Sequence, residues 1–133
     1  MIRPGTFVLV LFPTREQPHV PGLLHIGYVL TVANQEAIVA YTTSQPWPAG
    51  TPLPAGVRLF DASEAARLNQ SRAFILRLDV LARLPLTRAW FPDMEQRDRG
   101  ILAVASASLR NELTHLATNL VRRRRDLLQM RGP

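Results

Sequence analysis

The chain has 133 residues, which suits one domain, because two independent cores would each lie near the lower size limit for folding alone. Hydrophobic residues make up 47% and charged residues 20%, which excludes a chain that is disordered throughout. The absence of cysteine excludes disulfide frameworks, thiolate zinc sites, iron–sulfur clusters and cysteine nucleophiles.

Sixteen cations against ten anions give a net charge of +6, and every cation is an arginine. Arginine stays charged at any working pH, and its planar fork of donors suits phosphates and carboxylates. The excess predicts an anionic partner, which is nucleic acid, an acidic protein or a membrane surface. Because the apolar run 7–12 is too short for a signal peptide and no run reaches the ~18 apolar residues of a membrane span, we expect a cytoplasmic protein that does not enter a membrane.

Short β-branched and aromatic segments between prolines, glycines and polar turns predict strands along the first two thirds of the chain. In chain order these strands are 6–12, 23–32, 36–43, 57–60, 73–79 with a continuation past a bend to 84, and 88–91. The second and third strands form a predicted hairpin around Asn34 and Gln35. Four prolines in residues 45–56 exclude a central strand there.

Two helices are predicted. Asp61 and Glu64 have the spacing of a capping box, which predicts a short helix at 63–68. A stripe of apolar residues at steps of three and four predicts a long amphipathic helix over 95–131. The stripe consists of Leu102, Ala105, Leu109, Leu113, Leu116 and Leu120. Several short strands followed by one helix predict a single domain over 1–133, mainly β, with a small bent sheet or barrel and a C-terminal helix.

Four stretches combine apolar strands with characteristic ends. Gly5–Pro13 opens with glycine and closes with phenylalanine-proline, His25–Thr31 is a short apolar strand, Ile38–Ser44 ends in hydroxyl residues, and Leu68–Leu84 spans a later strand pair. In this order they resemble the MazF/PemK (Kid) family of toxins, the mRNA interferases of type II toxin–antitoxin pairs. The resemblance implies a small SH3-like (CcdB/MazF-type) β-barrel, a homodimer, single-stranded RNA as the bound partner, and an acidic antitoxin protein.

The chain departs from the family pattern at two positions. Thr6 stands where the family has an aspartate after the first glycine, and His25-Ile26 stands where it has its catalytic arginine and a proline. Aligning Pro21-Gly22 instead leaves no cation there at all. The resemblance therefore leaves two functions open. One is a metal-independent endoribonuclease, and the other is a catalytically inactive module on the same fold that contacts RNA, gyrase or a protein partner. A structural adaptor that dimerises through the helix face 101–120 is a third hypothesis.

RNA cleavage without a metal needs a base, an acid and a cation for the phosphorane charge. His25 is the predicted base or acid, and Thr42, at the end of the neighbouring strand, is predicted to orient the phosphate. From the loop before the second strand, His19 is predicted to reach over the site and Arg15 to stabilise charge. Against these roles stand ordinary ones, since a single strand histidine is often structural and threonine suits a strand by propensity alone.

Further RNA contacts are predicted from Thr43 and Trp47, with Trp47 stacking on an unpaired base or packing against the protein. Four consecutive arginines, Arg122, Arg123, Arg124 and Arg125, repel one another and gain from phosphates or from an acidic antitoxin nearby, although a solvated helix end would look the same. Three histidines without close spacing do not predict a metal site, and no cofactor is expected.

Overall fold

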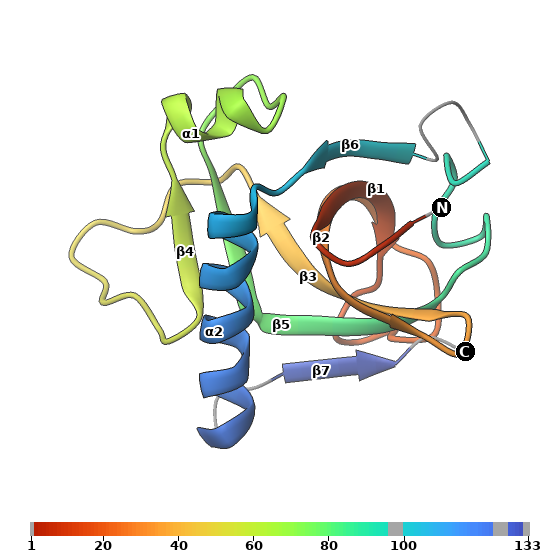
Figure 1. Ribbon diagram of the computed structural model, residues 1–133. Helices are drawn as coiled ribbons and strands as arrows, with labels where there is room; N and C mark the ends of the chain where they lie inside the picture. Colours follow the sequence, from red (N-terminus) through yellow and green to blue (C-terminus); the bar gives the residue numbers. More distant parts are fainter. Residues whose placement is uncertain (1, 96–99, 124–127, 132–133) are drawn as a thin grey trace.

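The structure, a computed structural model, describes residues 2–95, 100–123 and 128–131 (Figure 1). Its strands are β1 Thr6–Phe12, β2 Leu23–Ala33, β3 Glu36–Thr43, β4 Val57–Phe60, β5 Phe74–Pro85, β6 Ile101–Val104 and β7 Leu128–Arg131. Its helices are α1 Ala62–Arg67 and α2 Ala107–Arg123.

The strands form one curled sheet in the order β4-β5-β3-β2-β1-β6, and every neighbouring pair on this path is antiparallel. β7 lies off the path and pairs with β5 in parallel. The sheet curls into a half-barrel, and α2 packs against β5 on one face (Figure 1). The predicted architecture, mainly β with a C-terminal helix, is confirmed at this level. In the described part of the chain, no helix is both long and apolar enough to cross a membrane.

β5 bends sharply, and its bend produces the curl. Ala40 of β3 lies opposite Leu81, whereas the next residue, Tyr41, lies opposite Arg77, so residues 78–80 have no partner on β3. The amide of Leu78 donates instead to the carbonyl of Gly56 just before β4. Extra residues of this kind bend a strand and increase its twist. The first half of β5 therefore pairs with β4 and the end of β3, and the second half pairs with the start of β3 and with β7.

Apolar side chains are buried on both faces of the sheet. One cluster, which includes Phe7, Tyr28 and Leu76, packs under Ala65 and Leu68 at α1 and under Leu113 and Leu120 of α2. In the other cluster, the strand residues Val10, Val29, Val39 and Leu84 meet Trp90 and Phe91. Because side chains alternate along a strand, neighbouring residues such as Phe7 and Val8 belong to different clusters.

Two local predictions are confirmed with their mechanisms. Asn34 and Gln35 both have positive φ, 54° and 62°, which is the backbone of the tight hairpin turns that match strand twist. The Asp61 carboxylate accepts from the Glu64 amide at 2.8 Å, and the Glu64 carboxylate accepts from the Asp61 amide at 3.1 Å. This reciprocal cap begins α1 one residue before the predicted start.

Two predictions near the end of the chain were wrong. Residues 88–91 form a turn rather than a strand, because the amides of Trp90 and Phe91 both donate to the carbonyl of Thr87. The long helix begins at Ala107 rather than at 95. Just before Ala107, the Ser106 hydroxyl accepts a hydrogen bond from the Leu109 amide at 3.1 Å. Residues 101–104 are instead the edge strand β6, so Leu102 and Ala105 fitted the helical spacing by coincidence. Residues 128–131 are also a strand.

Gly27 allows three strands to pack closely. A Cβ at this position would lie 2.3 Å from Cγ1 of Val39 and 2.9 Å from Cγ1 of Val10, both of which are buried. We expect Gly27→Ala to lower the free energy of unfolding by about 1–3 kcal/mol through overpacking. Chemical denaturation measures this loss. The double variant with Val39→Ala makes room for the new methyl, so its loss should be smaller than the sum of the two single losses, and strict additivity would contradict the packing.

Arg58 of β4 joins both helices. Its guanidinium donates to Glu64 at 2.7 Å and to Glu112 at 2.9 Å, and it lies 4.3 Å from the centre of the Phe60 ring. The hydrogen bond from Arg58 holds the pKa of Glu64 below its usual 4.5.

A carboxylate whose pKa is lowered by folding stabilises the protein above its unfolded pKa, and this contribution is lost as the pH falls through the folded value. We therefore expect Arg58→Met to cost about 1–2 kcal/mol at pH 7, and the difference from the parent to shrink below pH ~4 in denaturation curves. A difference independent of pH would show that only packing is lost.

Candidate functional site

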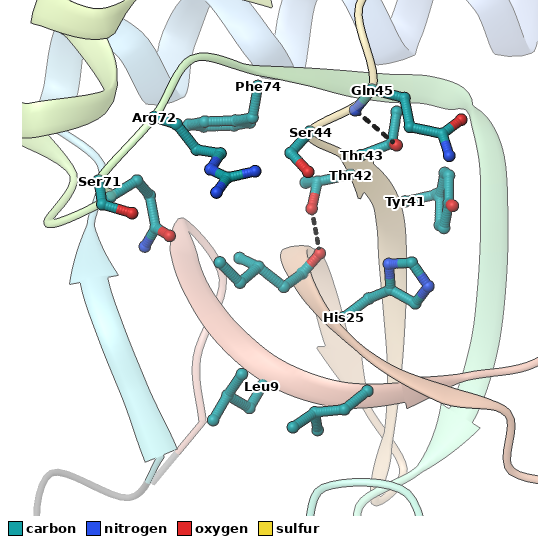
Figure 2. A pocket seen from close by; sticks show the side chains of 13 residues that line it. Leu9, His25, Tyr41, Thr42, Thr43, Ser44, Gln45, Ser71, Arg72 and Phe74 are labelled. Carbon is teal, nitrogen blue, oxygen red and sulfur yellow. Dashed lines mark hydrogen bonds between the residues drawn. The ribbon is translucent and has the colours of Figure 1, made fainter.

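A cleft of about 520 Å³ opens where β2 begins, β3 ends and β5 begins. We call it the central cleft (Figure 2). Its apolar part comes from Leu9, Leu24, Ile26 and Phe74. Most of the remaining lining is polar but uncharged, and it includes Thr43, Ser44, Gln45, Gln70 and Ser71.

Strand register brings His25 and Thr42 to this cleft. Gly27 lies opposite Tyr41, and the hydroxyl of Thr42 donates to the carbonyl of Ile26 at 2.5 Å. Both predicted residues line the cleft, from neighbouring strands. Their side chains differ in availability, however. Thr42 is only 5% exposed and its proton is engaged within the sheet, whereas the His25 ring is half-buried. Thr42 therefore contributes to the floor of the cleft, and its hydroxyl oxygen can act only as an acceptor while this bond lasts.

His25 stands at the boundary between the central cleft and a second hollow. Its ring centroid lies 4.9 Å from that of Tyr41, with the two planes tilted by 55°. Both rings also line a smaller pocket of about 360 Å³, which we call the side pocket. The imidazole can thus contact a ligand in either space.

Arg72 is the charged residue of the central cleft that the sequence analysis missed. It lies in the polar segment between α1 and β5, next to Gln70 and Ser71, and its side chain is directed into the central cleft (Figure 2). This segment follows Asn69, whose positive φ of 60° ends the helical turn. An arginine in a polar connection between two elements was the available signal, because loops on a rigid scaffold often carry binding groups.

The central cleft is biased toward anions. It contains the Arg72 guanidinium and the His25 imidazole, and none of its described lining residues is an aspartate or glutamate. Hydroxyl and amide side chains around the guanidinium and the imidazole add hydrogen-bond donors. The described residues also hold no group of three histidine, aspartate or glutamate side chains close enough to share a metal ion.

The side pocket contains the predicted loop residue Arg15, together with Thr14, Phe12, Leu23 and Arg77. Arg77 makes two hydrogen bonds with Asp79, from Nε to Oδ1 at 3.0 Å and from Nη2 to Oδ2 at 2.6 Å. This pairing raises the pKa of Arg77, although part of the effect is offset by burial. Asp79 is 6% exposed, so the pair neutralises a carboxylate that the bend of β5 has buried.

Trp47 lies outside the central cleft. Its ring covers the guanidinium of Arg77 at 5.3 Å, and its Nε1 donates to the carbonyl of Thr51 at 3.0 Å. It also lines a separate, mostly apolar hollow with Pro46, Leu59 and Ile75. The packing role that the sequence left open for Trp47 is therefore present, and one of its faces is occupied by Arg77.

In the described part of the chain, the remaining predicted RNA-contact residues do not line the central cleft. His19 is exposed in the loop between β1 and β2 and lines none of the three hollows described above. Arg122 and Arg123 end α2, while Arg124 and Arg125 lie outside the described residues. The RNA-binding role of this arginine run remains a prediction.

The Arg77–Asp79 pair gives a test of the bend. We expect Asp79→Asn to lower the free energy of unfolding by about 1–3 kcal/mol, because a half-buried guanidinium loses its charged partner. The control is Arg88→Gln. It breaks a pair with Glu95 whose atoms are 3.6 Å apart and whose side chains are about 70% exposed, so its effect should stay within about 0.5 kcal/mol. Urea denaturation of both variants measures the difference. Equally small effects would show that the Arg77–Asp79 pair does not stabilise the bend.

Comparison with known proteins adds no family. No protein-family model and no curated protein matches this sequence. The likeness to MazF/PemK toxins therefore rests on the four stretches quoted above, and the function must be argued from the geometry of the central cleft.

Proposed function

We propose that this protein binds single-stranded RNA in the central cleft, as a toxin-like module whose half-barrel is of the SH3-like (CcdB/MazF) type. The observation that carries the proposal is the pairing of Arg72 and His25 in one cleft that is otherwise lined by neutral donors and apolar groups, with no carboxylate among its described lining residues. A guanidinium with hydroxyl and amide neighbours is a chemical match for a phosphodiester and the sugar hydroxyls beside it.

The size of the cleft favours a nucleotide chain over a folded protein partner. About 520 Å³ lies within the usual range of small-ligand pockets, which accommodates one or two nucleotides but not a helix. Leu24, which is 53% exposed, and Leu9 provide apolar surface for a ribose or base beside the charged groups. The net charge of +6 adds a long-range attraction for the rest of the strand. An acidic antitoxin would compete with RNA for the same cations.

Cleavage of the bound RNA is a second candidate function, and it is favoured by the opposite placement of His25 and Arg72 in the cleft (Figure 2). An imidazole can accept the proton of a 2′-hydroxyl, whose oxygen then forms a bond to phosphorus. The bond from phosphorus to the 5′-oxygen breaks, and that oxygen takes a proton from the imidazolium or from water. The products are a 2′,3′-cyclic phosphate and a 5′-hydroxyl, and Arg72 would stabilise the extra charge on the phosphorane.

One experiment separates binding from cleavage. A long single-stranded RNA is incubated with the purified protein in EDTA, and binding is measured by fluorescence anisotropy at several salt concentrations. We expect Arg72→Gln to weaken binding by about 10- to 100-fold and to reduce the slope of log K against log salt by about 0.7 for each lost phosphate contact. His25→Ala should abolish cleavage and change affinity much less.

The matched control is Arg67→Gln, which removes an exposed arginine of α1 that does not line the central cleft. It should leave RNA affinity nearly unchanged apart from a small general charge effect. Equal losses in the Arg67 and Arg72 variants would mean that only net charge attracts the RNA, and this would contradict the proposal. Tight binding without cleavage in the parent would support RNA binding as the function and would contradict the nuclease hypothesis.

A further inference from the structure

The side pocket has a floor made of flat side chains from three adjacent strands. His25 comes from β2, Tyr41 from β3 and Arg77 from β5. Tyr41 is the register partner of Gly27 on one side and of Arg77 on the other. The Tyr41 ring centroid lies 4.9 Å from that of His25 and 5.2 Å from that of Phe12, so the rings are in contact across the sheet, with each pair of planes tilted by 55°. All three side chains are half-buried, which leaves part of each available to a ligand.

Arg77 is held as part of this floor. Its two bonds to Asp79 fix the plane of the guanidinium, and Trp47 covers it from the neighbouring loop. Because Asp79 neutralises its charge, Arg77 presents a flat π-surface more than a site for a free anion. Arg15, on the loop that follows β1, brings a second guanidinium to the pocket.

The walls of the side pocket suit a flat heterocycle with polar edges. Phe12, Pro13, Leu23 and Val80 are apolar, and polar atoms enter from Thr14 and Arg15. None of its described lining residues is acidic. Nucleobases have apolar faces and hydrogen-bonding edges, and unpaired bases stack on aromatic rings and on guanidinium planes. A volume of about 360 Å³ has room for a single base with part of its ribose.

We propose that the side pocket binds the unpaired base of the nucleotide adjacent to the phosphate in the central cleft. This inference rests on the proposed function, because it assumes that an RNA strand occupies the central cleft. The two spaces share His25 and Tyr41, so a strand whose phosphate meets Arg72 brings a neighbouring base over Tyr41. Stacking with few edge contacts makes this recognition tolerant of base identity while excluding paired RNA, whose bases are not free to leave the stack.

The test uses uridine pentamers with 2′-fluoro riboses, which cannot be cleaved because they lack the 2′-hydroxyl. In each of five oligomers one base is replaced by an abasic sugar, so that the charge stays constant. For the parent protein we expect one abasic position to weaken binding by about 5- to 100-fold, which corresponds to the loss of one stacked base. At the other positions the effect should be smaller.

The matched variants are Tyr41→Phe and Tyr41→Leu. Tyr41→Phe keeps the ring and should keep the sensitivity at that position, whereas in Tyr41→Leu the intact and abasic oligomers should bind within about twofold of each other. A 2-aminopurine at the sensitive position should lose fluorescence when the parent binds, which tests stacking even if Tyr41→Leu does not fold.

The outcomes separate the two proposals. If the parent binds no oligomer, both proposals fail. If it binds all five abasic oligomers as tightly as the intact one, the side pocket takes no base while RNA binding stands. Equal abasic sensitivity in Tyr41→Leu and the parent would place the stacked base elsewhere on the protein and would overturn the inference.

Discussion

The bend of β5 is the constraint on which the sheet and both pockets depend. Three residues, 78–80, have no partner on β3, so the first half of β5 pairs with β4 and the end of β3, while the second half pairs with the start of β3. The bend places Asp79 where water hardly reaches it, and the Arg77 guanidinium satisfies that carboxylate. Burying a charge is tolerable only with such a partner, so the bend and the ion pair stabilise each other.

The candidate ligand groups meet beside the half of β5 that precedes this bend. The ladder between β2 and β3 stops at Gly27 and Tyr41, whereas Thr42 and Thr43 stay paired with the start of β5, and the segment after α1 places Arg72 at the cleft beside them. On the other side of His25 the planar side chains of Tyr41 and Arg77 line the side pocket. One curl of the sheet therefore produces two adjacent spaces with different chemistry. The central cleft is polar and cationic, and the side pocket is mostly apolar and flat.

Neighbouring spaces of this kind suit a polymer more than a small molecule. A phosphodiester strand presents charge and flat apolar surface at regular intervals, and the shared residues His25 and Tyr41 connect the groups that would meet each of them. Under the proposed function, His25 takes the position that carries an arginine in the MazF/PemK toxins, and Arg72 brings a guanidinium into the same cleft from another part of the chain. Under the proposed function, the cation has moved to a different element while the cleft keeps its preference for anions.

The sequence by itself determined the elements whose signals are local. Side-chain alternation and turn residues predict the strands from β1 to β5 and the turn at Asn34, and capping predicts the start of α1 at Asp61. The same strand pattern places His25 and Thr42 at neighbouring strand ends. Tertiary structure alone decided the edge strand β6, whose Leu102 mimics helical spacing, because pairing with β1 outweighs a short periodic pattern. It also decided the entry of Arg72 into the cleft, since the pairing of β3 with the start of β5 brings this segment beside Thr42 and Thr43, which are distant in sequence.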